Sequence, residues 1–99
     1  MTDAPLSPDR VALLLQVALL GEVSPALRRA GFDLGDRRVT LRFFYDGPVA
    51  DDDRESASCV ETEVIAALPD DVRVTTRVER VDAPARLPEP ERLVYSRRE

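Results

Sequence analysis

The stretch RVTLRFFYDG, residues 38–47, carries the clearest strand pattern in this chain. Val39, Leu41 and Phe43 occupy every second position, and polar residues lie between them. A period of two is typical of a strand that buries one face against a core. The Asp-Gly-Pro sequence at its end predicts that the strand stops there.

A second strand is predicted directly before it, over residues 26–34. Ala30, Phe32 and Leu34 share one face at the same period of two. The sequence LGDR at 34–37 supplies a turn between the two segments. We therefore expect the two strands to form a β-hairpin.

A helix is predicted before the hairpin, over residues 8–20. Ser7 suits the N-cap position and Pro8 suits the first helical position. Gly21 is a natural residue to follow the last turn, and Pro25 prevents any continuation of the helix.

A second helix is predicted from about Asp52 to Leu68. Asp52 followed three residues later by Glu55 indicates a capping box, and Pro69 ends the helix. On a helical projection the apolar residues gather on one side with Glu61 among them: Ala57, Val60, Val64, Ile65 and Leu68.

Two further strands are predicted after the second helix. Residues 70–81 alternate, with the side chains from Val72 to Val78 at every second position facing inward. The three prolines of residues 82–91 indicate an extended, polyproline-like loop. Residues 92–98 then form the fourth strand.

The resulting order, α-β-β-α-β-β, predicts an α+β fold. The economical arrangement is a two-layer sandwich, in which two helices cover one face of a four-stranded, mostly antiparallel sheet. A permuted ferredoxin-like arrangement would give the strand order 1-2-4-3, and a simple meander would give 1-2-3-4. We expect residues 1–99 to form a single domain, with residues 1–6 and Glu99 frayed.

The composition excludes several classes of function. The net charge of -5 disfavours a nucleic-acid-binding role, because contact with phosphates needs a positive surface. The chain has no His, so the commonest general base and metal ligand is missing. We find no Gly-rich phosphate loop, CxxC, HExxH or GxSxG motif, and therefore expect no catalysis, no cofactor and no metal.

The sequence predicts a cytoplasmic protein. A single Cys rules out an internal disulfide and fits a reducing compartment. The N-terminal residues lack the positive region of a secretory signal. The apolar run from Val11 to Leu20 is too short to span a bilayer, which needs about 20 residues.

Acidic residues are concentrated between Asp46 and Asp71. Nine acids and one Arg give this segment a charge of -8, so the rest of the chain carries +3. Three readings are open: a solvated helix face, a docking surface that steers a basic partner, or a metal-dependent module. The acids that we predict to face a partner are Asp51, Asp52, Asp53, Glu55 and Glu63.

Two residues of the second helix, Glu61 and Cys59, differ from the acids expected to face a partner. Glu61 lies among apolar positions, where a carboxylate must be paired or must reach solvent from the rim. Its candidate partners are Arg42 and Gln16. Cys59 falls almost opposite the apolar side, and no His is present to activate it, so we interpret it as an exposed, unreactive thiol.

The first helix is apolar on two sides. Val11, Leu14, Leu15 and Ala18 form one side, which suits a core. The other side carries the three residues Leu13, Val17 and Leu20. Either the rest of the chain wraps this second side, or another chain covers it, as a homodimer or a different protein.

The chain resembles a family of short bacterial proteins that is similar to the immunity proteins of polymorphic toxin systems, of the type numbered thirty-nine. The resemblance spans almost the whole chain. Its most specific segments are LLLQVALLG at 13–21, LR at 27–28, RFFYDG at 42–47 and SASCVETEVIAALPDD at 56–71.

This resemblance implies a stoichiometric inhibitor that binds a toxin and protects the cell that makes it, with no chemistry of its own. The acidic segment would then meet a basic toxin domain. Two alternatives remain: a structural or regulatory homodimer through the first helix, and a small metal-dependent module built on the acidic cluster.

Overall fold

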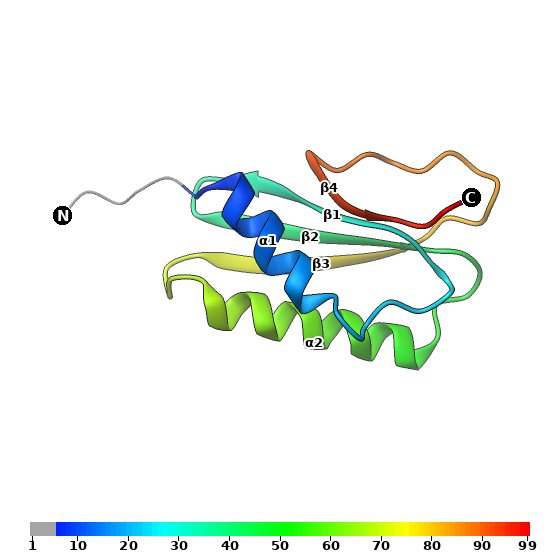
Figure 1. The fold of residues 1–99 in the computed structure, drawn as a ribbon, viewed down its shortest axis with the longest axis horizontal. Helices are drawn as coiled ribbons and strands as arrows, with labels where there is room; N and C mark the ends of the chain where they lie inside the picture. Colours follow the sequence, from blue (N-terminus) through cyan, green and yellow to red (C-terminus); the bar gives the residue numbers. More distant parts are fainter. Residues whose placement is uncertain (1–5) are drawn as a thin grey trace.

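The computed structural model describes residues 6–99 and has the predicted order of two helices and four strands (Figure 1). The elements are α1 (Pro8–Ala18), β1 (Leu27–Gly35), β2 (Arg38–Tyr45), α2 (Asp51–Ala67), β3 (Arg73–Arg80) and β4 (Arg92–Ser96). The α+β fold is therefore confirmed, with element ends that shift by up to three residues from their predicted positions.

The strand order is β3-β2-β1-β4, which differs from both orders considered above. Strands β1 and β2 form the predicted antiparallel hairpin, and β4 pairs antiparallel with the other edge of β1. Strand β3 instead runs parallel to β2, because α2 carries the chain back along the sheet as a crossover. The sheet is thus mixed, and the permuted ferredoxin arrangement is wrong.

Both helices cover the same face of the sheet, as predicted. Helix α1 packs on β1, β4 and α2, whereas α2 runs along the β3 side (Figure 1). The alternating residues of β2, Val39, Leu41 and Phe43, are buried beneath them. From the helices the core receives Val11, Leu15, Ala18, Ala57, Val60 and Val64.

The helix starts differ in how they are capped. Ser7 caps α1, and its Oγ accepts a hydrogen bond from the backbone N of Arg10 at 3.3 Å. The capping box predicted for α2 is wrong, because the N-cap is Ala50 and no side chain caps the helix. Within residues 6–99, neither helix has the length and apolar character needed to cross a membrane.

The proline-rich loop of residues 81–91 covers part of the second face of the sheet. Phe44, which points to that face, is fully buried, and Leu87 and Pro90 of the loop are buried as well. Pro90 packs so closely on Gly31 that a Cβ at that position would collide with the proline ring. The absence of a side chain at Gly31 therefore gives the loop its seat on β1.

The C-terminal residue is tied to the same sheet by Arg28, which is only 2% exposed. Nε and Nη2 of Arg28 donate to the Glu99 carboxylate at 2.7 and 2.8 Å. Nη1 donates to the carbonyl oxygens of Val81 and Ala85 at 2.8 and 3.0 Å. Glu99, which sequence analysis leaves in a frayed end, thus takes part in a paired cluster.

Candidate protein-binding surface

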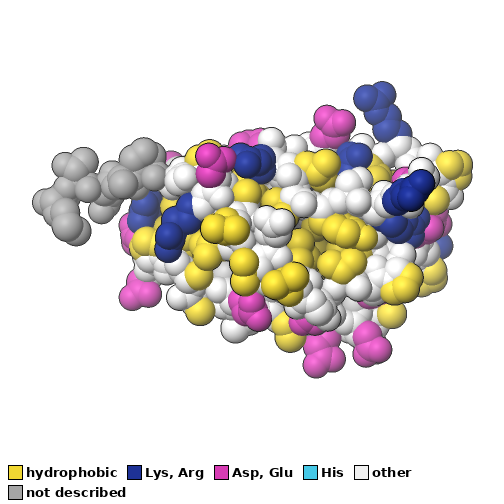
Figure 2. All heavy atoms as spheres, viewed as in Figure 1, with side chains coloured by type: hydrophobic (Ala, Val, Ile, Leu, Met, Phe, Trp, Pro, Cys, Tyr) yellow, Lys and Arg dark blue, Asp and Glu magenta, His cyan; other side chains and the backbone are white. Residues whose placement is uncertain are grey.

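An apolar stripe lies on the outer side of α1 and of the turn that follows it. Leu13, Val17 and Leu20 are 60%, 54% and 76% exposed, so no part of the described chain wraps them. The opposite side of the same helix packs into the core through Val11, Leu15 and Ala18. Figure 2 shows hydrophobic side chains gathered over α1 on this face of the molecule. We call Leu13, Val17 and Leu20 the apolar stripe.

The apolar stripe leads into a shallow groove at the C-terminal end of α1. The groove has a volume of about 210 Å³ and lies between α1, the segment after it and β4. Its lining residues are Gln16, Leu19, Leu20, Val23, Val94 and Tyr95. Sequence analysis missed this hollow, because it depends on β4 pairing beside β1. The one signal in the sequence was Val23, an apolar residue after the helix that is 40% exposed.

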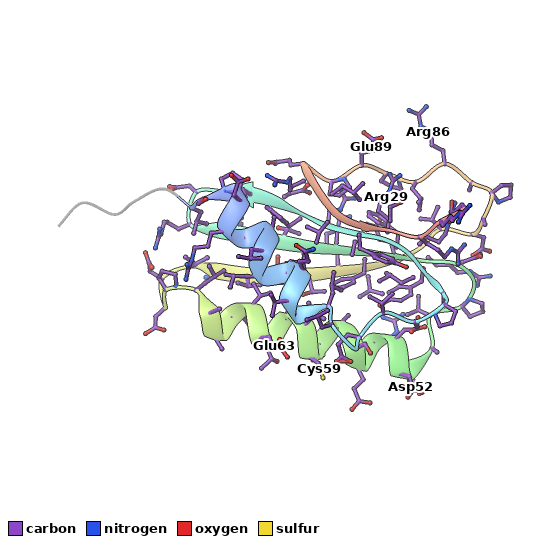
Figure 3. All side chains as sticks on the ribbon, in the orientation of Figure 1. Arg29, Asp52, Cys59, Glu63, Arg86 and Glu89 are labelled. Atoms are coloured by element: carbon purple, nitrogen blue, oxygen red, sulfur yellow. The ribbon has the colours of Figure 1, made fainter. Side chains whose placement is uncertain are left out.

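An acidic rim lies on the outer side of α2. Asp51, Asp52, Glu55 and Glu63 are all exposed, and none has an ion-pair partner among the described residues. Figure 3 shows Asp52, Cys59 and Glu63 on the side of α2 that points away from the sheet. We call Asp51, Asp52, Glu55 and Glu63 the acidic rim.

Asp53 is the one predicted partner-facing acid that the structure removes from this surface. It is only 7% exposed, and it falls on the same helical stripe as the buried Ala57, Val60 and Val64. Residues four and seven positions apart share one side of a helix, so position 53 faces the core. The hydroxyl of Tyr45 donates to the backbone carbonyl of Asp53 at 3.4 Å, and burial raises the pKa of Tyr45 to about 12.

Other acids of the segment serve within the chain. Asp71 forms an ion pair of 2.7 Å with Arg37, and this hydrogen-bonded guanidinium lowers the pKa of Asp71. Asp46 accepts hydrogen bonds from the side chain of Arg97 and the backbone of Ala83. The charge count of -8 therefore overstates the acidity available to a partner.

Glu61 lies at the rim of the helix and Cys59 is exposed, which are two of the positions considered from the sequence. Glu61 is half-buried at the rim of the packed side of α2. Neither proposed partner reaches it, because Arg42 lies on the other face of the sheet and pairs with Asp33 and Glu79. Cys59 is an exposed free thiol. Ile65, which the helical projection places with the core, is 49% exposed.

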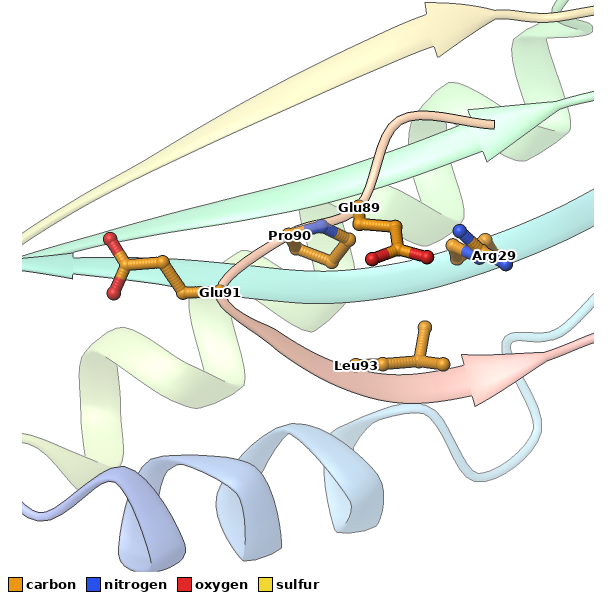
Figure 4. Close-up of a pocket in the computed structure, with 5 residues that line it drawn as sticks. All are labelled: Arg29, Glu89, Pro90, Glu91 and Leu93. Carbon is orange, nitrogen blue, oxygen red and sulfur yellow. The ribbon is translucent and has the colours of Figure 1, made fainter. Parts of the chain in front are cut away.

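A second hollow, of about 250 Å³, lies where the proline-rich loop meets the sheet (Figure 4). Its lining residues are Arg29, Glu89, Pro90, Glu91 and Leu93. Arg29 donates to the carbonyl oxygen of Pro88 at 3.3 Å, and the backbone N of Glu91 donates to Asp33 at 2.8 Å. The polar groups here anchor the loop to β1.

A metal centre finds no support in this arrangement. Among residues 6–99, no three or more Cys, Asp and Glu side chains come together in a group that could hold a metal ion. Asp51, Asp52 and Asp53 are consecutive on a helix, so their side chains point in different directions. The acids of α2 are instead spread along one outer side, next to the apolar stripe of α1.

A surface of this kind suits contact with another protein. Residues 8–99 match the model of the MafI2 immunity protein family. The chain belongs to that family. A search of curated proteins found no match to this chain. The sequence-based resemblance was to immunity proteins and, more narrowly, to the type numbered thirty-nine. Membership supports the broader assignment, that of an immunity protein. The MafI2 match spans every helix and strand of the fold, including the apolar stripe and the acidic rim.

Proposed function

We propose that this MafI2-family chain neutralises a bacterial protein toxin by binding it stoichiometrically through the helix layer, without chemistry of its own. The observation that carries the proposal is the juxtaposition of the apolar stripe and the acidic rim on neighbouring helices. The resemblance to the type numbered thirty-nine stays a prediction, as does the cytoplasmic location.

The two parts of this surface suit different tasks in binding. Burial of apolar side chains at the centre of an interface, where water is excluded, supplies affinity. Charged residues at the edge contribute less affinity, but they accelerate association with a partner of opposite charge. The acidic rim therefore favours a toxin with a basic surface.

Co-expression tests the proposal directly. The proposal predicts that a toxin domain is encoded beside this chain, and that domain is expressed in bacteria with the wild-type protein or with the variant Leu13→Ser/Leu20→Ser. We expect the wild type to restore growth and to form a one-to-one complex in size exclusion. Loss of two exposed leucine contacts should weaken the complex by about 2–4 kcal/mol, or roughly 30- to 1,000-fold in Kd.

Both changes lie at exposed positions, so the variant should unfold at the same temperature as the wild type. The matched control is Ile65→Ser on α2, which removes an exposed apolar side chain outside the apolar stripe. Toxicity that the wild-type chain does not relieve, or equal protection by the double variant, would contradict the proposal.

A homodimer through the apolar stripe is the second candidate, because the same exposed leucines favour it. Light scattering on the purified chain at micromolar to millimolar concentration separates the two. A monomer across that range would remove the homodimer. A dimer that the Leu13→Ser/Leu20→Ser change dissociates would support it.

A further inference from the structure

The face of the sheet opposite the helices carries a regular array of arginines. In the parallel register of β2 and β3, Arg38 lies beside Arg73, and Arg42 lies beside Arg77. Side chains of directly paired residues project from the same face of a sheet. We call these four residues the arginine array.

The array brings like charges together, which is unfavourable for the sheet. Directly opposite like charges destabilise neighbouring strands. Only Arg42 is compensated, because its guanidinium lies 3.5 Å from Asp33 and 3.3 Å from Glu79. Arg38, Arg73 and Arg77 are exposed and have no ion-pair partner among residues 6–99. Three of the four guanidinium groups thus lack a compensating carboxylate in the described part of the chain, and a local rule broken in this way points to a function.

The remaining surroundings of the arginine array are polar. Between the two arginine pairs, the hydroxyl of Thr75 donates to that of Thr40 at 3.4 Å. The proline-rich loop covers only the other end of this face, where Phe44 lies buried. The Cζ atom of Arg42 lies over the Phe44 ring, 5.1 Å from its centroid. The end that holds Arg38, Arg73 and Thr75 is open to solvent.

The spacing of the array sets the ligand that fits it. Residues four apart on a strand are separated by about 13 Å, at roughly 3.3 Å per residue. An extended peptide that lies along β2 and β3 has the same repeat. A first carboxylate would meet Arg38 and Arg73. A second, four residues along the peptide, would meet Arg77, because Arg42 beside it is already paired with Asp33 and Glu79. Guanidinium groups bind carboxylates with paired hydrogen bonds.

We infer that the arginine array is a second protein-binding surface, which takes an extended acidic segment of a partner protein with carboxylates four residues apart. It lies on the opposite side of the sheet from the helix layer, so both surfaces are accessible at once. A nucleic acid fits less well, because no exposed aromatic ring on this face is available to stack on a base, and the chain carries a net charge of -5.

The test uses the whole chain and two labelled peptides. The first is a fluorescein-labelled strand-forming peptide of Thr and Val with two glutamates four residues apart, and the second has glutamines at those positions. We expect saturable binding of the first in fluorescence anisotropy at low salt, and at least about tenfold weaker binding of the second. Equal binding of the two peptides, or no binding of either peptide, would overturn the inference.

The variant Arg73→Gln/Arg77→Gln assigns the binding to the array. We expect it to weaken the acidic peptide by about tenfold or more. The control Arg54→Gln/Arg86→Gln removes the same charge from two exposed arginines elsewhere and should leave the affinity unchanged. Equal weakening by both variants would show a general charge effect and would contradict a site.

Three further measurements complete the test. The reversed variant Arg73→Glu/Arg77→Glu should lose the acidic peptide and gain one with two lysines at the same spacing. Arg73→Gln should raise the melting temperature, because it removes one like-charge pair. A lower melting temperature would contradict the unfavourable repulsion within the arginine array. Tighter binding of a labelled single-stranded oligonucleotide than of the acidic peptide, at equal salt, would also overturn the inference.

Discussion

Arg28 is the residue on which the closure of the C-terminal end depends. Its guanidinium joins β1 to Glu99 and to two carbonyl oxygens of the loop after β3. We expect Arg28→Ala to lower the melting temperature clearly, because both carbonyl oxygens lose this donor and the Glu99 carboxylate loses two hydrogen bonds, while it keeps one from Arg97 at 3.1 Å. Arg98→Ala, which removes an exposed arginine with no ion-pair partner among residues 6–99, is the matched control. Equal melting temperatures for the two variants would contradict the role of Arg28.

The same cluster makes stability depend on pH. The Arg28 guanidinium lowers the pKa of Glu99 from an ordinary value of 4.5 to about 2. A lowered pKa stabilises the folded state above the unfolded value, and this contribution is lost as the pH falls from 4.5 toward 2. We expect the wild type to exceed Glu99→Gln in urea stability at pH 7, and the difference to shrink through that window. A difference independent of pH would be inconsistent with this pairing.

At single positions, the sequence was most informative where a helical or strand period applies. The helical period placed Leu13, Val17 and Leu20 opposite the core side of the first helix but left open whether the chain wraps them, and the structure leaves them exposed. The error at Asp53 arose from counting charges without their helical phase, although Ala57 and Val60 already marked that side as buried. No pattern in the sequence indicates that Arg28 meets Glu99, since the contact joins residues far apart in the chain.

Between elements, the seat of the proline-rich loop on β1 depends on Gly31. A Cβ there would collide with the Pro90 ring and with the backbone of β4. We expect Gly31→Ala to destabilise the fold by about 1–3 kcal/mol, in the range of overpacked cores. The control is Gly35→Ala at the end of the same strand, where a Cβ meets only ordinary contacts of 3.5 Å or more. Equal losses in the free energy of unfolding for the two variants, measured in urea, would contradict the close packing of Pro90 on Gly31.

The uncapped start of α2 gives a prediction of the opposite sign. Ala50 has the extended backbone of an N-cap, with φ of -70° and ψ of 157°, but no side chain that can accept a hydrogen bond. We expect Ala50→Ser to stabilise the protein by about 0.5–1 kcal/mol, because serine caps free backbone N–H groups. Ala66→Ser, at an exposed position inside α2, should not stabilise. Denaturant midpoints that rank the two variants in reverse order would refute this role for position 50.

The strand order shows what local patterns leave open. Each strand was predicted from alternation within a few residues, and the β1–β2 turn made their pairing local as well. The place of β3 depends instead on α2, which returns the chain so that β3 lies parallel beside β2. β4 then pairs with β1 across more than fifty residues of intervening sequence. The arginine array follows from that parallel register and was therefore invisible to sequence analysis.

Across the whole molecule, charge is divided between the two layers. The acidic rim lies on the helix layer, and the arginine array lies on the opposite face of the sheet. A net charge of -5 thus conceals two surfaces of opposite sign. Such a division orients the molecule in the field of an approaching charged partner, so that the helix layer would meet a basic surface first.

This division predicts the kinetics of toxin binding under the proposed function. Asp52→Asn/Glu63→Gln weakens the acidic rim without touching the apolar stripe, so we expect the association rate to fall by about tenfold at low salt. The dissociation rate should change little, because rim charges steer encounter more than they hold the complex. The control Asp36→Asn/Glu89→Gln makes the same change in net charge at two exposed acids outside α2. Stopped-flow measurements across a salt series would decide the matter: if both variants slow association equally, net charge acts alone, and the acidic rim has no directing role.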